Sequence, residues 1–173
     1  MQILVTGFSA GGKSVLTRKI SEKFDIPRLE MDRLWFECGG HDCQINGCTP
    51  EEDRRVKDCI QEKVQEFLST NDQWVIDGAY VNIDPLVAEW ATIVVVIRRP
   101  VLKRLASHIY RVLRGRDRHP ETGRWRDLLF VKTILRRFWR GENKKLDTAL
   151  APYQDKAVSL TSFKEIDAYF ESL

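Results

Sequence analysis

The sequence predicts an α/β protein, a three-layer α/β/α sandwich around a five-stranded parallel sheet. Short apolar segments alternate with longer segments of helical periodicity, which is typical of parallel strands joined by crossover helices. Residues 92–97 form a continuous β-branched run, as in a strand that is buried on both faces. A glycine-rich stretch, residues 7–14, lies between the first strand pattern and the first helix pattern.

The bulk composition indicates one globular domain. The 173 residues suffice for one compact core, so we treat 1–173 as a single domain. The longest apolar run, 91–97, is much shorter than the ~20 residues that cross a bilayer, so no membrane partner is expected. The N-terminus shows no export pattern, and the expected location is the cytoplasm, where thiols stay reduced.

Positive charge gathers in the third quarter of the chain. The net charge is only +3, yet residues 98–145 hold 16 Lys and Arg against 4 Asp and Glu. Such a block suits a triphosphate, a phosphorylated acceptor or nucleic acid, depending on how the charges are arranged.

The first half of the chain predicts two strands and two helices. A strand over 2–6 leads into a helix over 12–24, which Pro27 ends. A weak strand over 28–31 then ends at Asp32.

The second helix follows an aperiodic loop over 37–48. Thr49 is its expected N-cap, Pro50 lies in its first turn and Glu52 completes a capping box. The apolar stripe continues to about Leu68.

The second half predicts three more strands, over 74–78, 92–97 and 157–160. A short helix begins at 84–85, and another begins at Pro100. In the helix after Pro100, the side chains expected inside are Leu102, Leu105, Ala106, Ile109 and Leu113, and those expected on its polar side are Arg104, His108 and Arg111.

A polar loop over 115–123 precedes a helix to about Arg140, and Ser162 with Glu165 begins a terminal helix through Phe170. Right-handed crossovers place the carboxyl ends of all parallel strands at one edge of the sheet. We expect the first strand to be central.

Residues 7–14 fit the phosphate-binding loop pattern of a glycine, four residues, Gly-Lys and Ser or Thr. Lys13 is expected to reach the β and γ phosphates and Ser14 to ligate Mg²⁺, while backbone amides cradle the phosphates. The alternative is a glycine-rich turn without a ligand. The expected nucleotide contacts in this stretch are Gly7, Ser9, Ala10, Gly11, Gly12, Lys13, Ser14 and Val15.

Two carboxylates follow predicted strands at the same edge. Asp77 is expected to hold Mg²⁺ together with Ser14, and its alternative is a cap in an Asp-Gly turn. Asp32 is expected to accept a proton from an acceptor hydroxyl or to orient it; for a phosphate acceptor it becomes a metal or substrate contact.

Arginines are the candidates for contacting the transferred group. We expect Arg114 and Arg118 to act in catalysis and Arg111 to contact the nucleotide, with the segment 114–124 closing as a lid. About two or three arginines of this region are expected to reach phosphate, while most exposed arginines solvate a surface; the candidates are Arg104, Arg111, Arg114, Arg116, Arg118 and Arg124. The segment 32–70 is the expected acceptor side.

The chain resembles small P-loop kinases of the adenylate-kinase-like group, specifically the family labelled DNA topology modulation proteins. The resemblance rests on the phosphate loop, on the segments 31–35, 74–80 and 97–100, and on Phe138-Trp139. It implies a P-loop NTPase fold of the nucleoside-monophosphate-kinase type, with ATP and Mg²⁺ as donor. It also implies an acceptor pocket around Asp32, Trp35 and Tyr80, and places the loop 161–163, with Ser162, near adenine.

The chain departs from this pattern at Val15, where many phosphate loops have a second hydroxyl, and at Ala79, where an Asn is expected. A further departure is a group of cysteines. Cys38, Cys43 and Cys48 with His41 could bind zinc or could be reduced thiols in a loop, and Cys59 is expected in the core.

The sequence therefore favours a kinase that transfers the γ-phosphoryl group of ATP to a small acceptor, possibly a nucleoside monophosphate. The alternative is an ATP-binding, nucleic-acid-associated regulator, indicated by the cationic block with Trp125 and Trp139. A third is a nucleotide-sensing domain without turnover.

Overall fold

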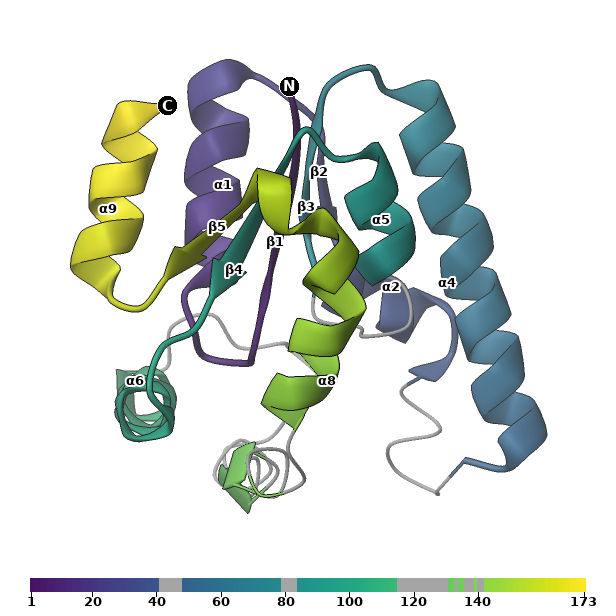
Figure 1. The fold of residues 1–173 in the computed structure, drawn as a ribbon. Helices are drawn as coiled ribbons and strands as arrows, with labels where there is room; N and C mark the ends of the chain where they lie inside the picture. The colour runs from purple at the N-terminus through teal and green to yellow at the C-terminus, as the bar shows by residue number, and fades with distance from the viewer. Residues whose placement is uncertain (41–47, 79–83, 115–130, 133, 136–138, 140–141) are drawn as a thin grey trace.

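A five-stranded parallel sheet forms the centre of the molecule, in the order β2-β3-β1-β4-β5 (Figure 1). The computed structural model describes residues 1–40, 48–78, 84–114, 131–132, 134–135, 139 and 142–173. The strands are β1 (Gln2–Gly7), β2 (Arg28–Glu30), β3 (Trp74–Asp77), β4 (Ile93–Ile97) and β5 (Ala157–Leu160). The predicted central position of the first strand is confirmed.

Helices cover both faces of this sheet, which confirms the three-layer α/β/α architecture. The helical elements are α1 (Lys13–Phe24), α2 (Met31–Glu37), α4 (Pro50–Thr70), α5 (Asp84–Trp90), α6 (Val101–Arg114), α8 (Glu142–Leu150), the 3-10 helix η1 (Ala151–Lys156) and α9 (Phe163–Ser172). None of the helices in the described ranges is long and apolar enough to cross a membrane.

Two apolar cores separate the layers. On one face, Leu16 of α1 and Ile166 of α9 pack against β1 and β4. On the other face, Ile60 of α4, Val87 of α5 and Leu146 of α8 pack against the sheet. Successive side chains of a strand point to opposite faces of the sheet. Because both faces are covered by an apolar core, the buried strands are apolar at every position, which explains their continuous apolar runs.

Strand register brings the candidate residues to one edge. Val5 of β1 pairs with Asp77 of β3, which in turn pairs with Glu30 of β2. Gly7 pairs with Ile97 at the end of β4. The carboxyl ends of four strands therefore lie beside the loop after β1.

The predicted helix starts are confirmed. The Thr49 hydroxyl accepts from the Glu52 amide at 3.2 Å, and the Glu52 carboxylate accepts from the Thr49 amide at 2.8 Å. Ser162 is the N-cap of α9. By contrast, β2 ends at Glu30, so Asp32 does not end a strand but lies in the first turn of α2.

The orientation predicted for α6 is wrong. Leu102 and Leu113 are 75% and 69% exposed, whereas Arg104 and His108 are 4% and 7% exposed. The buried face of α6 packs toward the phosphate loop, where the Arg104 guanidinium lies 5.1 Å from the ring centre of Phe8. The buried face of α6 therefore contacts a polar site and not the apolar core that the prediction assumed.

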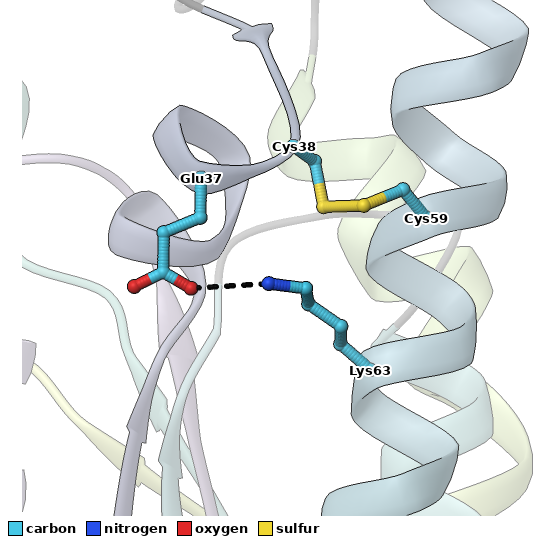
Figure 2. Close-up of a disulfide and its surroundings, with 4 residues drawn as sticks. All are labelled: Glu37, Cys38, Cys59 and Lys63. Atoms are coloured by element: carbon cyan, nitrogen blue, oxygen red, sulfur yellow. Dashed lines mark hydrogen bonds and ion pairs between the residues drawn. A yellow bond between two sulfur atoms is a disulfide. The ribbon is translucent and has the colours of Figure 1, made fainter.

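The cysteine predictions also need correction. Cys38, at the end of α2, forms a disulfide with Cys59 of α4, so neither is a reduced thiol (Figure 2). Cys48 is disulfide-bonded as well. A zinc site that uses Cys38 and Cys48 is therefore excluded by this structure; His41 and Cys43 lie outside the described residues. No described group of three or more His, Cys, Asp and Glu could hold a metal ion.

Candidate active site

The loop between β1 and α1 has a backbone that its glycines make possible. Gly7 and Gly12 have φ angles of 129° and 108°. A Cβ atom on Gly7 would lie 2.4 Å from the carbonyl oxygen of Ile97 in β4. The loop therefore passes so close to the neighbouring strand that a side chain at Gly7 cannot be accommodated.

The N-terminus of α1 is open to an anion. Its N-cap, Gly12, has no side chain to accept a hydrogen bond, and the first turn contains no acidic residue. The amides of this turn carry the positive end of the helix dipole. Together with the glycine-shaped loop, they form the kind of cradle that binds phosphate groups.

Lys13 lies across this loop. Its side chain is largely buried, with 8% of the residue exposed, and its Nζ atom is 3.5 Å from the carbonyl oxygen of Phe8. The ammonium group is thus held near the phosphate cradle. Its charge also interacts with that of Asp77.

Asp77 ends β3 and faces the start of α1. Burial raises the pKa of its carboxyl group, while the charge of Lys13, a hydrogen bond from the Ser14 side chain and the charge of Arg28 oppose this rise. The nearby charge of Asp32 raises the pKa further. Lys13, Ser14 and Asp32 therefore all lie close enough to Asp77 to affect the pKa of its carboxyl group.

The oxygen atoms of Ser14 and Asp77 fit a magnesium ion. Mg²⁺ prefers oxygen ligands and usually binds through one or two protein groups, with water and phosphate oxygens completing its shell. Ser14 is exposed, and its side chain lies close enough to Asp77 to lower the pKa of the Asp77 carboxyl group.

Two buried arginines adjoin the loop, in a placement that the helical pattern did not indicate. Arg99 is 7% exposed; it donates to the carbonyl oxygen of Ala10 at 3.2 Å, and its guanidinium lies 3.7 Å from the ring centre of Phe163. Burial lowers the pKa of both Arg99 and Arg104, and the charge of Arg99 lowers that of Arg104 further.

These guanidinium groups still carry charge at neutral pH, because arginine does not deprotonate in proteins. In the described part of the chain, no carboxylate pairs with either group, and both Nε atoms lack a hydrogen-bond acceptor. Two buried positive charges beside a phosphate cradle favour an anionic ligand. The signal in the sequence was the Arg-Pro pair, residues 99–100, directly after the most buried strand.

The fold is found in solved structures that include two kinases. Shikimate kinase from Acinetobacter baumannii, in complex with shikimate, matches with a TM-score of 0.59 and 17% identity over 98% of this chain and 88% of that one. Deoxyadenosine kinase from M. mycoides matches with 0.55 and 14% over 99% and 98%. TT1252 from Thermus thermophilus matches with 0.59 and 12% over 98% and 94%. The chain shares its fold with these solved structures.

The likeness is one of fold alone. No protein-family model matches the chain, and no curated protein matches it in sequence. In the shared fold, the glycine-rich loop of this chain follows the central strand β1 and precedes α1, and a strand, loop and helix in this order is the context that the phosphate-loop pattern requires.

The remaining predicted contacts lie in different settings. Val15 is 41% exposed on α1. Arg111 is exposed on α6, as is Arg114, whose guanidinium lies 4.6 Å from the ring centre of Tyr110. The Ser162 hydroxyl donates to the Glu165 carboxylate at 3.0 Å. Outside the described residues lie Ala79, Tyr80, Arg116, Arg118 and Arg124, and with them nearly all of the expected lid.

Proposed function

We propose that this protein is a phosphotransferase that moves the γ-phosphoryl group of ATP to a small acceptor. The observation that carries the proposal is the convergence of Lys13, Ser14 and Asp77 at the mouth of a glycine-shaped loop. Phosphoryl transfer requires alignment and charge neutralisation more than covalent chemistry, and these residue types supply both.

Each group has a distinct role in this proposal. The loop amides and the N-terminus of α1 bind the phosphates, and Lys13 neutralises charge on the β and γ groups. Ser14 and Asp77 would hold Mg²⁺, which would supply further positive charge to the phosphates when bound. Arg99 and Arg104, buried beside the loop, add positive charge close to the triphosphate.

The acceptor side consists of α2 and α4, with Asp32 at its inner end. Asp32 is exposed in the first turn of α2 and lies close enough to Asp77 for their charges to interact. We infer that Asp32 accepts the proton of an acceptor hydroxyl, or orients a phosphate acceptor that needs no base. Trp35, half-buried one helical turn further on, belongs to the same surface.

The nucleic-acid alternative depends on a continuous outer stripe of arginines. Within the described ranges, Arg99 and Arg104 instead turn inward toward the loop, while Arg111 and Arg114 face outward. This arrangement favours a phosphate ligand in the loop over a duplex on the surface.

The test is a screen for ADP formation that depends on an added acceptor. Nucleoside monophosphates, deoxynucleosides and hydroxylated carboxylic acids are supplied with ATP, with Mg²⁺ present or chelated. We expect one class to stimulate ADP formation only with Mg²⁺. Lys13→Ala should lower the rate by about 100-fold or more, whereas Lys19→Ala, which loses a surface ion pair to Asp167, should not. Equal rates in wild type and Lys13→Ala would refute the assignment.

A further inference from the structure

Arg28, the first residue of β2, connects three elements of the site. Its Nε donates to the Thr17 hydroxyl at 2.9 Å, and its two terminal nitrogens lie 3.1 Å from Glu30 Oε1 and 3.9 Å from Asp77 Oδ2. The Arg28 side chain is only 16% exposed.

The contacts of Arg28 close a ring around the magnesium ligands. Thr17 is fully buried in α1, and its hydroxyl also lies 3.4 Å from the carbonyl oxygen of Ser14. The Ser14 side chain in turn lies close enough to Asp77 to lower the pKa of the Asp77 carboxyl group. Arg28 therefore ties the helix that carries the Ser14 hydroxyl to the strand that carries the Asp77 carboxylate.

The distances indicate that Arg28 attracts the Asp77 carboxylate without forming a hydrogen bond to it. At 3.9 Å the guanidinium attracts the Asp77 carboxylate but makes no hydrogen bond to it, so the carboxylate oxygens remain available to another cation. Glu30, which pairs with Asp77 in the strand register, takes the closer contact. Arg28 thus separates two carboxylates that would otherwise repel each other across neighbouring strands.

We propose that Arg28 is a positioning residue that holds Asp77 in register with Ser14 for binding magnesium together with ATP. The inference rests on the proposed function, and Arg28 itself touches neither phosphate nor acceptor. Groups that orient metal ligands typically affect metal affinity by about 10-fold or more. Removing Arg28 should therefore weaken only that part of ATP binding which depends on Mg²⁺.

The chain offers a matched control in Arg98. This residue follows β4, which flanks the central strand β1 on the side opposite β3. Its Nε donates to the Ser159 hydroxyl at 2.9 Å, and its guanidinium pairs with Asp147. Arg98 thus makes the same kinds of contact as Arg28, from a strand end to a hydroxyl and a carboxylate, but none of the hydrogen bonds and ion pairs among the described residues joins it to Asp77 or Ser14. Comparing the two variants therefore separates the effect of losing any arginine that links strands from the effect of losing Arg28 beside Asp77.

The experiment measures ATP affinity by titration calorimetry, in Mg²⁺ and in a chelator, for the wild type, Arg28→Met, Arg28→Lys and Arg98→Met. We expect Arg28→Met to lower the affinity about 10-fold in Mg²⁺ and to leave it unchanged in chelator. Arg28→Lys keeps the charge but not the three-way contact and should fall between. Arg98→Met should match the wild type in both conditions.

The outcomes separate the two proposals. A wild type that binds no ATP in either condition refutes the proposed function. A wild type that binds Mg-ATP, with Arg28→Met equal to it or equally weakened in both conditions, refutes the positioning role alone. If Arg28→Met does not fold, Thr17→Val is measured instead, because it removes the link from Arg28 to α1. A Thr17→Val variant that loses no ATP affinity specifically in Mg²⁺ would also refute the positioning role.

Discussion

The phosphate loop is shaped mainly by its own backbone, whereas the acceptor side is held by side-chain links between two helices. The loop, residues 7–14, packs closely against the end of β4, and Arg99 donates to its Ala10 carbonyl oxygen. On the acceptor side, the Cys38–Cys59 disulfide and the ion pair of Glu37 with Lys63 join α2 to α4 (Figure 2). The two regions can therefore be perturbed independently.

This difference assigns separate functions to the two regions. A backbone cradle recognises any triphosphate with the same geometry, so it can serve many substrates unchanged. In the proposed function the acceptor side determines what is phosphorylated, and in this chain the Cys38–Cys59 disulfide joins its two helices. Variants on the acceptor side should alter acceptor use and leave ATP affinity intact.

The largest effect that separates the regions is expected for Asp32→Asn. Loss of a general base should lower turnover by about 100-fold or more, while ATP affinity stays within about twofold of wild type. Steady-state kinetics and titration calorimetry measure the two quantities. Asp25→Asn, at the left-handed C-cap of α1 where Asn is tolerated, is the control. A parallel loss of ATP binding in Asp32→Asn places that residue in the donor site.

Gly7→Ala and Gly39→Ala compare the two regions directly. Both glycines have positive φ angles, of 129° and 86°. A Cβ on Gly7 meets Ile97, whereas one on Gly39 meets nothing within 4 Å. Gly7→Ala should cost about 3 kcal/mol in unfolding free energy and abolish ATP binding, and Gly39→Ala should cost about 1 kcal/mol. Urea denaturation measures both, and equal losses contradict the structure of the loop.

Removal of the Cys38–Cys59 disulfide should affect the acceptor side alone. The two residues are 21 apart in the sequence, and a crosslink of that span is worth about 3 kcal/mol of unfolding free energy. In the double variant Cys38→Ser with Cys59→Ser, we expect the acceptor KM to rise and the Kd for ATP to stay constant. Mass spectrometry of alkylated protein first establishes the crosslink, and a raised Kd for ATP would show that the regions are coupled.

The smallest effect is expected for Lys63→Met. A hydrogen bond from Lys63, assisted by one from Arg33, lowers the pKa of Glu37 below its ordinary value of 4.5. The pair therefore stabilises the fold at pH values above 4.5, and this contribution disappears as the pH falls through the lowered pKa. Lys63→Met should lower Tm slightly at about pH 7 and not at about pH 3. A large decrease at neutral pH would mean that the ion pair, rather than the disulfide, secures α2.

What the sequence could predict follows from the same contrast. The phosphate loop, the central strand and the Thr49 helix cap are local patterns, because each needs only residues a few positions apart. The central place of the first strand followed from the phosphate loop after it, since such a loop must meet groups from the strands on both sides. The amino-acid order alone is therefore sufficient to predict these features.

The errors concern contacts between distant segments. Apolar periodicity placed Leu102 and Leu113 inside, but it cannot tell an apolar core from a polar site, and Arg104 and His108 are buried instead. Cysteine spacing grouped Cys38 with Cys48, because nothing local reveals that a turn of α4 brings Cys59 opposite Cys38. Both errors concern residues whose contacts are determined by the tertiary fold and not by the local sequence pattern.

The most direct test of the account is a crystal structure with Mg²⁺ and a non-hydrolysable ATP analogue. The account predicts that the β and γ phosphates lie against the amides of residues 7–14, within hydrogen-bonding distance of Lys13 Nζ, with Mg²⁺ beside Ser14 and Asp77. Nucleotide bound elsewhere on the molecule, or a loop that remains closed around the Lys13 side chain with no phosphate in it, would contradict the account.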